Sequence, residues 1–417
     1  MNKLINIPDE WKTLIACLRC AIHDTPIPAG LKSTEWAVLL RQARQHSVEY
    51  FLFPWLSKNI PELFSARASV DTASAVSAWR ALALEHLRAT IIRQQQQTSA
   101  ILEVFAEARI DVIPLKGSWL SENIYDEASQ RFMFDIDLLV KKSDIERAHL
   151  TLIELGYKAT HDIRESTYVY DDSYYHPSYQ KFIELHWNVE SEEDESISIP
   201  DIEAIWKNIG SATLMGHPIN EFSYENQLSH LVEHILHHKL AMSLKSYLDI
   251  ALLLRKHGDE LSLEVLTSTT RLWKTGKATP FILMMVSEIF ETGIPEQLNA
   301  LCKGVDPDLL TAASEVLFEL PALDERAQEH NLLKYSQSSA AGRARLIFKR
   351  IFMPQAYMQI FYPFARNRML LPAAWLLRLL HLLKTTGGRI ASLDADQKNL
   401  KNARVREEIT KTIRRSF

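Results

Sequence analysis

The stretch that decides the fold runs from Val112 to Val140 and reads VIPLKGSWLSENIYDEASQRFMFDIDLLV. It opens with a short apolar run, which ends at the Lys-Gly-Ser tripeptide of residues 116–118. A helical pattern follows from about residue 119 to residue 125, and a second apolar run covers residues 132–140. This order predicts a strand, a tight turn, a helix and a further strand.

Two aspartates, Asp135 and Asp137, interrupt the second apolar run. They are two residues apart, so on a strand their carboxylates leave the same face. Phe134, Ile136 and Leu138 alternate with them and are expected to be buried on the opposite face. Two neighbouring carboxylates repel each other unless a positive charge lies between them. A divalent cation is the natural candidate, because Mg²⁺ prefers oxygen ligands and is bound by carboxylates together with substrate phosphates.

The turn before the predicted helix supplies the other half of such a site. Gly117 lets the backbone come close to a ligand, and Ser118 can cap the helix that follows. Free N–H groups and the positive end of the helix dipole then face one point, which suits a phosphate. Glu184, between Ile183 and Leu185 in a later strand-like run, offers a third carboxylate if that strand lies beside the aspartates. His186 points to the same side as Glu184 and is expected to be a structural neighbour and not a ligand.

These three pieces, in this order, resemble the nucleotidyltransferase superfamily with its DNA polymerase β-like fold. The pattern of that superfamily is Gly-Ser at the head of a helix, Asp-x-Asp on the next strand and an acidic residue on a later strand. More narrowly, the chain is similar to a bacterial family of uncharacterised nucleotidyltransferases with helical flanking regions. The resemblance is strong over about residues 112–187, including residues 112–140, AHLTLIELGY (148–157) and FIELHW (182–187). It is looser in the helical flanks, which include HSVEYFLFPWL (46–56), HLVEHILHH (230–238) and YP…LLPAAWLLR (362–378).

The resemblance implies the transfer of a nucleoside monophosphate from an NTP, such as ATP, to an acceptor, with release of pyrophosphate. Asp135, Asp137 and Glu184 would be the catalytic residues and would hold Mg²⁺ or Mn²⁺. The residues expected to bind the nucleotide are Lys116, Gly117, Ser118, Arg131, His238 and Lys245. Lys116 and Arg131 are expected either to contact the phosphates or to brace the carboxylates, and an ordinary surface ion pair is the alternative for each. The acceptor stays open between a protein, a peptide, a small molecule and RNA, because the helices that would bind it carry no readable code.

Two other functions compete with this interpretation. Many glycosyltransferases use Asp-x-Asp to bind a metal and a nucleotide-sugar, but that chemistry requires neither the Gly-Ser turn nor Glu184. The second alternative is a non-catalytic module that binds a nucleotide or a partner. The presence of all three carboxylates argues against a loss of turnover.

The composition is that of an ordinary soluble globular protein, and 417 residues suffice for two or three domains, since single cores stop growing beyond about 250–300 residues. With 12 glycines in all, the chain favours helix. The N-terminal MNKLINIPDEWKTL lacks the apolar core of a signal peptide, and no uncharged apolar run reaches the roughly 18 residues of a membrane span. The cytoplasm is therefore the expected location, and three cysteines fit a reducing compartment.

The predicted fold is α/β and predominantly helical, with a small mixed β-sheet embedded between helical regions. Four regions are expected, namely an N-terminal helical region (1–95), a nucleotidyltransferase core (96–190), a helical domain that closes the cleft (191–340) and a basic C-terminal helical region (341–417). The later strands of the core are expected at residues 157–160, 166–170 and 179–189.

The HLVEHILHH segment (230–238) contains four histidines. His234 and His238 are one helical turn apart and could chelate a metal, with Asp249 as a third ligand. No glutamate stands in the HExxH register, however, and helix histidines more often bond to core or backbone groups. The resemblance implies instead that this helical region packs against the sheet and closes the nucleotide cleft, where His238 or Lys245 would meet the triphosphate or the base.

The C-terminal region is basic, although the whole chain has a formal net charge of −5. Residues 342–417 contain sixteen Lys and Arg against four Asp and Glu. Within them, LLPAAWLLRLLHLLK (370–384) is too short and too polar to span a bilayer. It is a core helix, a helix that contacts a membrane surface through anionic lipid, or a partner surface. No nucleic-acid-binding module accompanies the basic residues, so there is no strong nucleic-acid signal.

Overall fold

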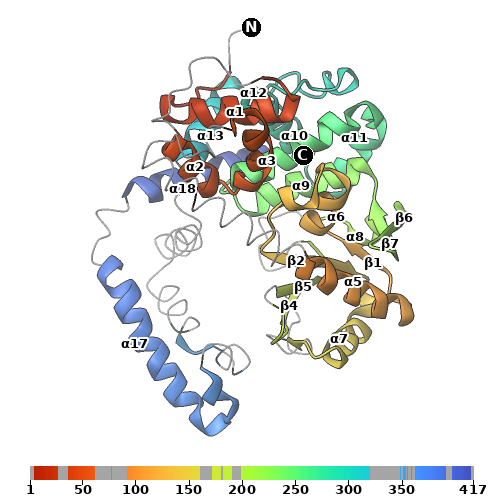
Figure 1. Ribbon diagram of the computed structural model, residues 1–417, viewed down its shortest axis with the longest axis vertical. Helices are drawn as coiled ribbons and strands as arrows, with labels where there is room; N and C mark the ends of the chain where they lie inside the picture. Colours follow the sequence, from red (N-terminus) through yellow and green to blue (C-terminus); the bar gives the residue numbers. More distant parts are fainter. Residues whose placement is uncertain are drawn as a thin grey trace.

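The computed structural model describes residues 4–26, 36–61, 92–159, 171–179, 182–189, 199–319, 362–390 and 397–414, with a few further positions at 77 and within 348–358. A helical body packs against a smaller α/β part that is built on a mixed sheet (Figure 1). The predicted class, α/β and predominantly helical, is confirmed.

A five-stranded sheet in the order β1-β2-β5-β4-β3 forms the centre of the α/β part. Its strands are β1 (Val112–Pro114), β2 (Asp135–Val140), β3 (Lys158–Ala159), β4 (Asp171–Tyr175) and β5 (Phe182–His186). β2 and β5 run parallel, and the other pairings are antiparallel, so the predicted small mixed sheet is confirmed. The strand predicted at 166–170 lies outside the described residues.

The alternation predicted around the two aspartates holds from Asp135 onwards. Ile136 and Leu138 are fully buried in the apolar core on one face of the sheet. The predicted burial of Phe134 is wrong, because its side chain is 51% exposed. The strand begins only at Asp135, so Phe134 precedes the alternating pattern, and its ring lies edge-on against Phe132.

Helices α5 (Ile92–Glu107) and α7 (Ile145–Glu154) cover the apolar face of the sheet, and the two aspartates lie on the opposite face. The two helices supply the apolar residues that pack on the apolar face. A hairpin that the sequence did not indicate, β6 (Ile209–Leu214) with β7 (His217–Phe222), packs against β1 and α5. The aspartate face therefore looks away from α5 and α7.

The helix after β1 begins earlier than the sequence predicted. α6 spans Lys116–Asn123 with Leu115 as its N-cap, so Gly117 and Ser118 lie in its first turn. Ser118 does not cap the helix, and its hydroxyl is buried without a hydrogen-bond partner among the described residues. The reason is a tertiary contact: the N–H of Leu115 donates to the carbonyl of Asp137, and the chain enters the helix directly after this bond.

The helical body is a second, larger core. Its helices are α1 (Lys12–His23), α2 (Trp36–Gln45), α3 (Glu49–Asn59), α9 (Tyr224–His237), α10 (Leu244–His257), α11 (Leu263–Leu272), α12 (Ala278–Phe290), α13 (Pro307–Phe318) and α18 (Gln397–Arg414). All of them contribute to one apolar cluster, which Trp119 and Leu120 of α6 also join. N-terminal, central and C-terminal helices thus pack together, and the four-region division of the chain stays a prediction.

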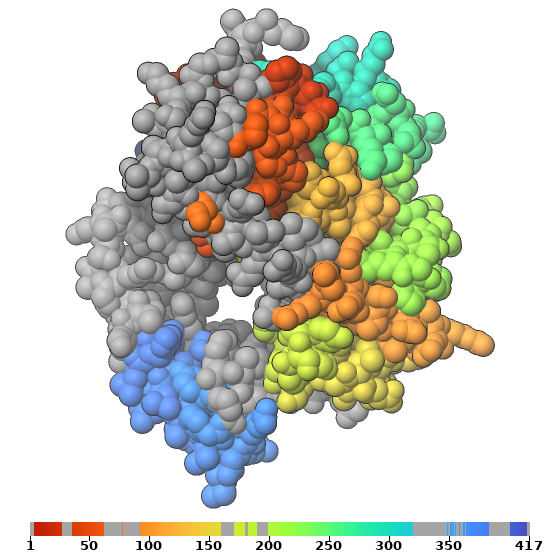
Figure 2. Space-filling view, viewed as in Figure 1, coloured from red at the N-terminus to blue at the C-terminus, as the bar shows by residue number. Residues whose placement is uncertain are grey.

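α17 (Leu371–Ile390) lies apart from the labelled helices of the body, and in the space-filling view its region occupies one end of the molecule (Figures 1 and 2). Leu376 is 58% exposed and Leu380 is 54% exposed, so the core-helix interpretation of this segment is wrong. Among the described helices, none combines the length and the apolar character that crossing a bilayer requires.

Candidate active site

Strand pairing brings the acidic residues of β2 and β5 together. The two strands are parallel and in register, with Asp137 opposite Glu184 and Asp135 opposite Phe182. Register partners on neighbouring strands share a face of the sheet, and His186, two residues after Glu184, leaves the same face. One face of the sheet therefore carries three carboxylates and an imidazole.

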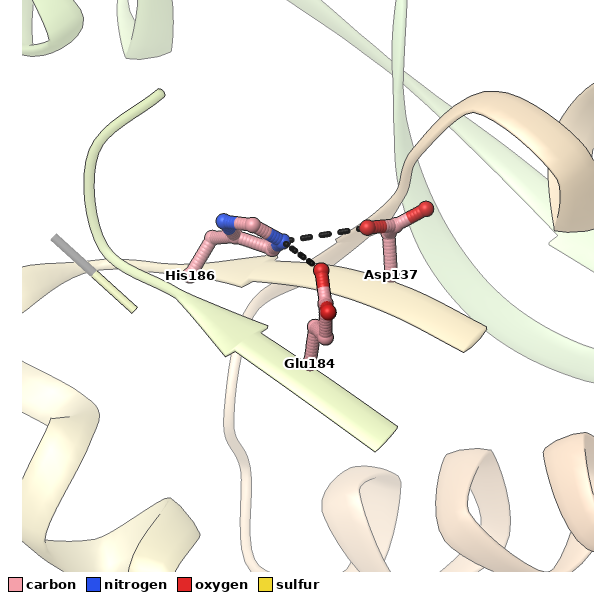
Figure 3. A group of neighbouring side chains, drawn as sticks. All are labelled: Asp137, Glu184 and His186. Carbon is pink, nitrogen blue, oxygen red and sulfur yellow. Dashed lines mark hydrogen bonds and ion pairs between the residues drawn. The ribbon is translucent and has the colours of Figure 1, made fainter. Parts of the chain in front are cut away.

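One ring nitrogen of His186 faces two of the carboxylates (Figure 3). Its Nε2 is 3.1 Å from Asp137 Oδ1 and 3.6 Å from Glu184 Oε2. On the other side, Lys116 Nζ is 3.2 Å from the same Oδ1 of Asp137. One ligand atom each of Asp137, Glu184 and His186 can be chosen within 4.8 Å of one another. Such a spacing lets these side chains share one cation.

The two basic groups set the charge of the buried aspartate. Burial by itself would raise the pKa of Asp137, but Lys116 and His186 hold that pKa well below its usual range. Burial would likewise lower the pKa of His186, yet its hydrogen bonds to Asp137 and Glu184 raise it to about 9. Asp135 has no such direct partner among the described residues, and burial, Asp137 and Glu184 raise its pKa to about 6. The positive charges of Lys116 and His186 thus balance only part of the negative charge of the three carboxylates.

Lys116 holds its position through an unusual backbone conformation. Its φ is +42°, in the left-handed region that non-glycine residues rarely adopt. It is the first residue of α6, so its N–H and those of the next two residues have no carbonyl one turn earlier in the helix. Burial alone would lower the pKa of Lys116, but the three carboxylates of the site raise it. A charged ammonium and free backbone donors therefore stand at the same edge of the site.

Arg131, expected to bind the nucleotide, is instead held by a buried carboxylate. It makes a bidentate pair with Asp249 of α10, with both N···O distances 2.8 Å, and Tyr125 donates to the same aspartate at 2.7 Å. Gly117 lies directly beside this pair: an added Cβ would overlap Met133 and would come within 3.1 Å of Arg131 Nη1. In this structure Arg131 braces the segment before β2.

Lys245 of α10 is buried beside the same segment. Its Nζ donates to the carbonyl of Phe132 at 3.2 Å and lies 5.4 Å from the centre of the Phe134 ring. Burial and the charge of Arg131 lower the pKa of Lys245 to about 7, while Asp249 and Asp135 act in the opposite direction. Lys245 thus belongs to the surroundings of Asp135, next to the site.

The helix histidines do not assemble into a metal site with Asp249. That aspartate already accepts hydrogen bonds from Arg131 and Tyr125. Among the described residues, the side chains close enough to share a metal ion are Asp137, Glu184 and His186. The rings of His234 and His238 meet edge to face, 4.7 Å apart. Burial lowers the pKa of His234 well below its usual range, and nearby Lys116 lowers it further. His238 is the C-cap residue of α9, and its contact with the nucleotide stays a prediction.

Two residues of the acidic face were underestimated or missed by the sequence analysis. His186 was expected to be only a structural neighbour, and Asp171 was not considered. Asp171 of β4 is the register partner of His186, and burial raises its pKa. The signal for both was the alternation of β4 and β5, which places every second residue on the face that carries Glu184. Only the pairing of these strands with β2 shows that this face is the acidic one.

The mixed sheet with its facing carboxylates, preceded by the Gly-Ser helix, places this chain in the nucleotidyltransferase superfamily. It belongs to the family described as uncharacterised nucleotidyltransferase, whose sequence profile matches residues 32–291, more than half of the chain. The segments 46–56 and 230–238 lie inside this match, whereas 362–378 lies outside it. A comparison with curated proteins and one with solved structures gave no match.

Proposed function

We propose that this protein transfers a nucleoside monophosphate from an NTP to a hydroxyl group of an acceptor and releases pyrophosphate. The observation that carries the proposal is the in-register pairing of Asp137 with Glu184 on parallel strands, with Asp135 on the same face. Lys116 at the start of α6 adds positive charge beside these carboxylates. Family membership favours this reaction over glycosyl transfer.

The donor set fits a divalent cation such as Mg²⁺ or Mn²⁺. Asp135, Asp137 and Glu184 would hold it, because oxygen ligands on one face suit hard cations. In this structure Lys116 and His186 supply the positive charge that the buried Asp137 requires. When bound, a divalent cation polarises the phosphate oxygens and lowers the pKa of an attacking hydroxyl.

The residues of the chain then have separate tasks. Lys116 and the N–H groups of the first turn of α6 bind the β- and γ-phosphates. The acceptor oxygen attacks the α-phosphorus and forms the new P–O bond, while the bond to the β-phosphate oxygen breaks and pyrophosphate leaves with the electron pair. Glu184, whose side chain is 30% exposed, accepts the proton of the acceptor hydroxyl. Which NTP is used, and whether the acceptor is a protein, a peptide, a small molecule or RNA, is left to the experiment.

The test incubates the purified protein with each common NTP labelled at the α-phosphate, with Mg²⁺ or Mn²⁺, and with lysate of its own cells. We expect label to enter one class of acceptor and unlabelled pyrophosphate to be released. Asp137→Asn serves as the inactive control. If binding of NTP is measured but no label is ever transferred, the protein is a nucleotide-binding module and the proposal is wrong.

A further inference from the structure

The outer face of α17 is apolar. Leu376, Leu377 and Leu380 are 58%, 45% and 54% exposed, and Met369, just before the helix, is 88% exposed. Within α17, positions 373, 376 and 380 follow the spacing of three to four residues that places side chains on one side of a helix. A helix on the surface of a globular protein normally turns its apolar stripe inward, and here the stripe faces outward.

The opposite side of α17 is packed and hydrogen-bonded, so the exposed stripe belongs to an ordered element. Trp375 donates its Nε1–H to the carbonyl of Met353 at 2.9 Å and meets the ring of Phe352 edge to face. Ala374 is fully buried in a small cluster with Met358. The orientation of the stripe is therefore fixed by contacts on the other side of the helix.

Exposed apolar side chains are concentrated in this part of the molecule. Of the fifteen large apolar side chains that are exposed among the described residues, eight fall between positions 348 and 380. They include Phe364, Met369 and Leu370, which directly precede α17 in the chain. Scattered exposed apolar residues are normal, whereas a concentration of this kind marks an interaction surface.

The charge of the same part of the chain identifies the partner. Residues 330–393 contain ten Lys and Arg and no Asp or Glu. Arg366 and Arg368 are exposed directly beside Met369, at the start of the stripe. Leucines next to arginines fit a partner that is apolar inside and anionic outside. A second copy of this chain would bring one positive face against another, which opposes that contact.

We propose that α17 and the segment before it bind the surface of an anionic membrane, with the leucine stripe at the boundary between headgroups and acyl chains. The arginines would then contact the lipid phosphates, and the helix would lie in the plane of the surface. This arrangement is typical of amphipathic helices that bind anionic lipid without crossing the bilayer. It does not depend on the proposed nucleotidyl transfer, since α17 lies outside residues 32–291.

The test measures co-sedimentation of the full-length protein with vesicles. One set contains phosphatidylglycerol mixed with phosphatidylcholine, and the other contains phosphatidylcholine alone. We expect binding to the first set, weaker at high salt, and a loss of this binding in Leu376→Glu/Leu380→Glu. The matched control is Leu150→Glu/Ile153→Glu on α7, where two similarly exposed residues, at 52% and 41%, lie away from the basic segment. It should bind as the wild type does.

A second variant tests the charge contribution. Arg366→Gln/Arg368→Gln should weaken binding to the anionic vesicles by roughly fivefold per arginine. Circular dichroism of each variant checks that the fold is retained. Equal binding to both vesicle types would show that the negative lipid charge is not recognised and would overturn the proposal. A concentration-dependent dimer that Leu376→Glu/Leu380→Glu dissociates, without vesicle binding by the wild type, would show that a second copy covers the stripe and would also overturn the proposal.

Discussion

Asp135 and Asp137 lie on one strand face, yet their surroundings differ. Lys116 and His186 pair with Asp137. In the part of the chain that the structure describes, Asp135 has no direct basic partner, and its pKa is raised by burial and by the other carboxylates. Replacing either residue should remove a ligand of the proposed metal, but the consequences for stability should be opposite. The difference arises because the carboxylate of Asp137 neutralises the buried side chains of Lys116 and His186, whereas that of Asp135 adds to the repulsion among the carboxylates.

We therefore predict that Asp135→Asn and Asp137→Asn both lose binding of Mn²⁺ with NTP in titration calorimetry. Asp135→Asn should leave the free energy of unfolding unchanged or slightly increased. Asp137→Asn should lower it by about 3 kcal/mol, because Lys116 and His186 stay buried without their counter-charge. Urea unfolding separates the two variants, and unchanged metal–NTP affinity in both would remove the aspartates from the metal site.

Glu184 distinguishes a transferase from a nucleotide binder. If the main role of Glu184 is to accept the acceptor proton, the two aspartates still hold the metal and the NTP in Glu184→Gln. This variant should therefore keep the NTP affinity nearly intact and reduce turnover by about 10²–10⁴. Glu154→Gln, on the exposed end of α7, is the control and should behave as the wild type. Single-turnover kinetics with labelled NTP measures the effect. Equal losses of affinity and turnover would mean that Glu184 mainly binds the nucleotide.

At the scale of the element, the start of α6 depends on the contact between Gly117 and Met133, which the sequence does not predict. Gly117 lies in the first turn of the helix, and its Cα faces Met133 and the guanidinium of Arg131. The glycine was expected to allow a triphosphate to approach the backbone. The structure supplies a second requirement, since a side chain at this position would overlap Met133.

Gly117→Ala should therefore destabilise the fold by about 1–3 kcal/mol, the usual cost of overpacking. Met133→Ala in the same chain should restore most of that loss, as measured by thermal unfolding. Nucleotide affinity of the double variant then separates the two requirements. If affinity returns with stability, packing alone explains the glycine; if it stays low, the close approach of the phosphate is supported.

At the scale of the whole molecule, a buried ion pair joins the segment before β2 to the helical body. The guanidinium of Arg131 and the carboxylate of Asp249 on α10 are nearly inaccessible to solvent, and Tyr125 bonds to the same carboxylate. The pair links residues 118 positions apart in the sequence and lies beside Gly117 at the head of α6. It thereby holds the start of α6 and the segment before β2 against the helical body.

Asp249→Asn should destabilise the protein by about 3–5 kcal/mol, because it leaves a buried guanidinium without its counter-charge. Arg131→Met should cost a similar amount for the converse reason. The double variant should cost clearly less than the two changes added together, since neither charge is then left alone. A double-mutant cycle in urea measures this coupling, and simple additivity would show that the two residues act independently.

The sequence by itself determined those features that depend only on residues close together in the chain. The alternation of Asp135 and Asp137 with Ile136 and Leu138 is local, and it correctly predicted a strand with an acidic face and a buried face. The order of the Gly-Ser, Asp-x-Asp and Glu184 pieces was sufficient to indicate the family. Periodicity of this kind is a property of a few consecutive residues, so it can be read without knowing the rest of the fold.

Only the tertiary structure decided which distant groups meet. Strand order places β5 next to β2 and so brings His186, 49 positions away, to Asp137. The pairing of Arg131 with Asp249, which lies 118 positions further along the chain, is likewise a long-range contact. The outward stripe of α17 likewise depends on which side of the helix is packed. These outcomes follow from long-range pairing and burial, and local sequence patterns do not specify them.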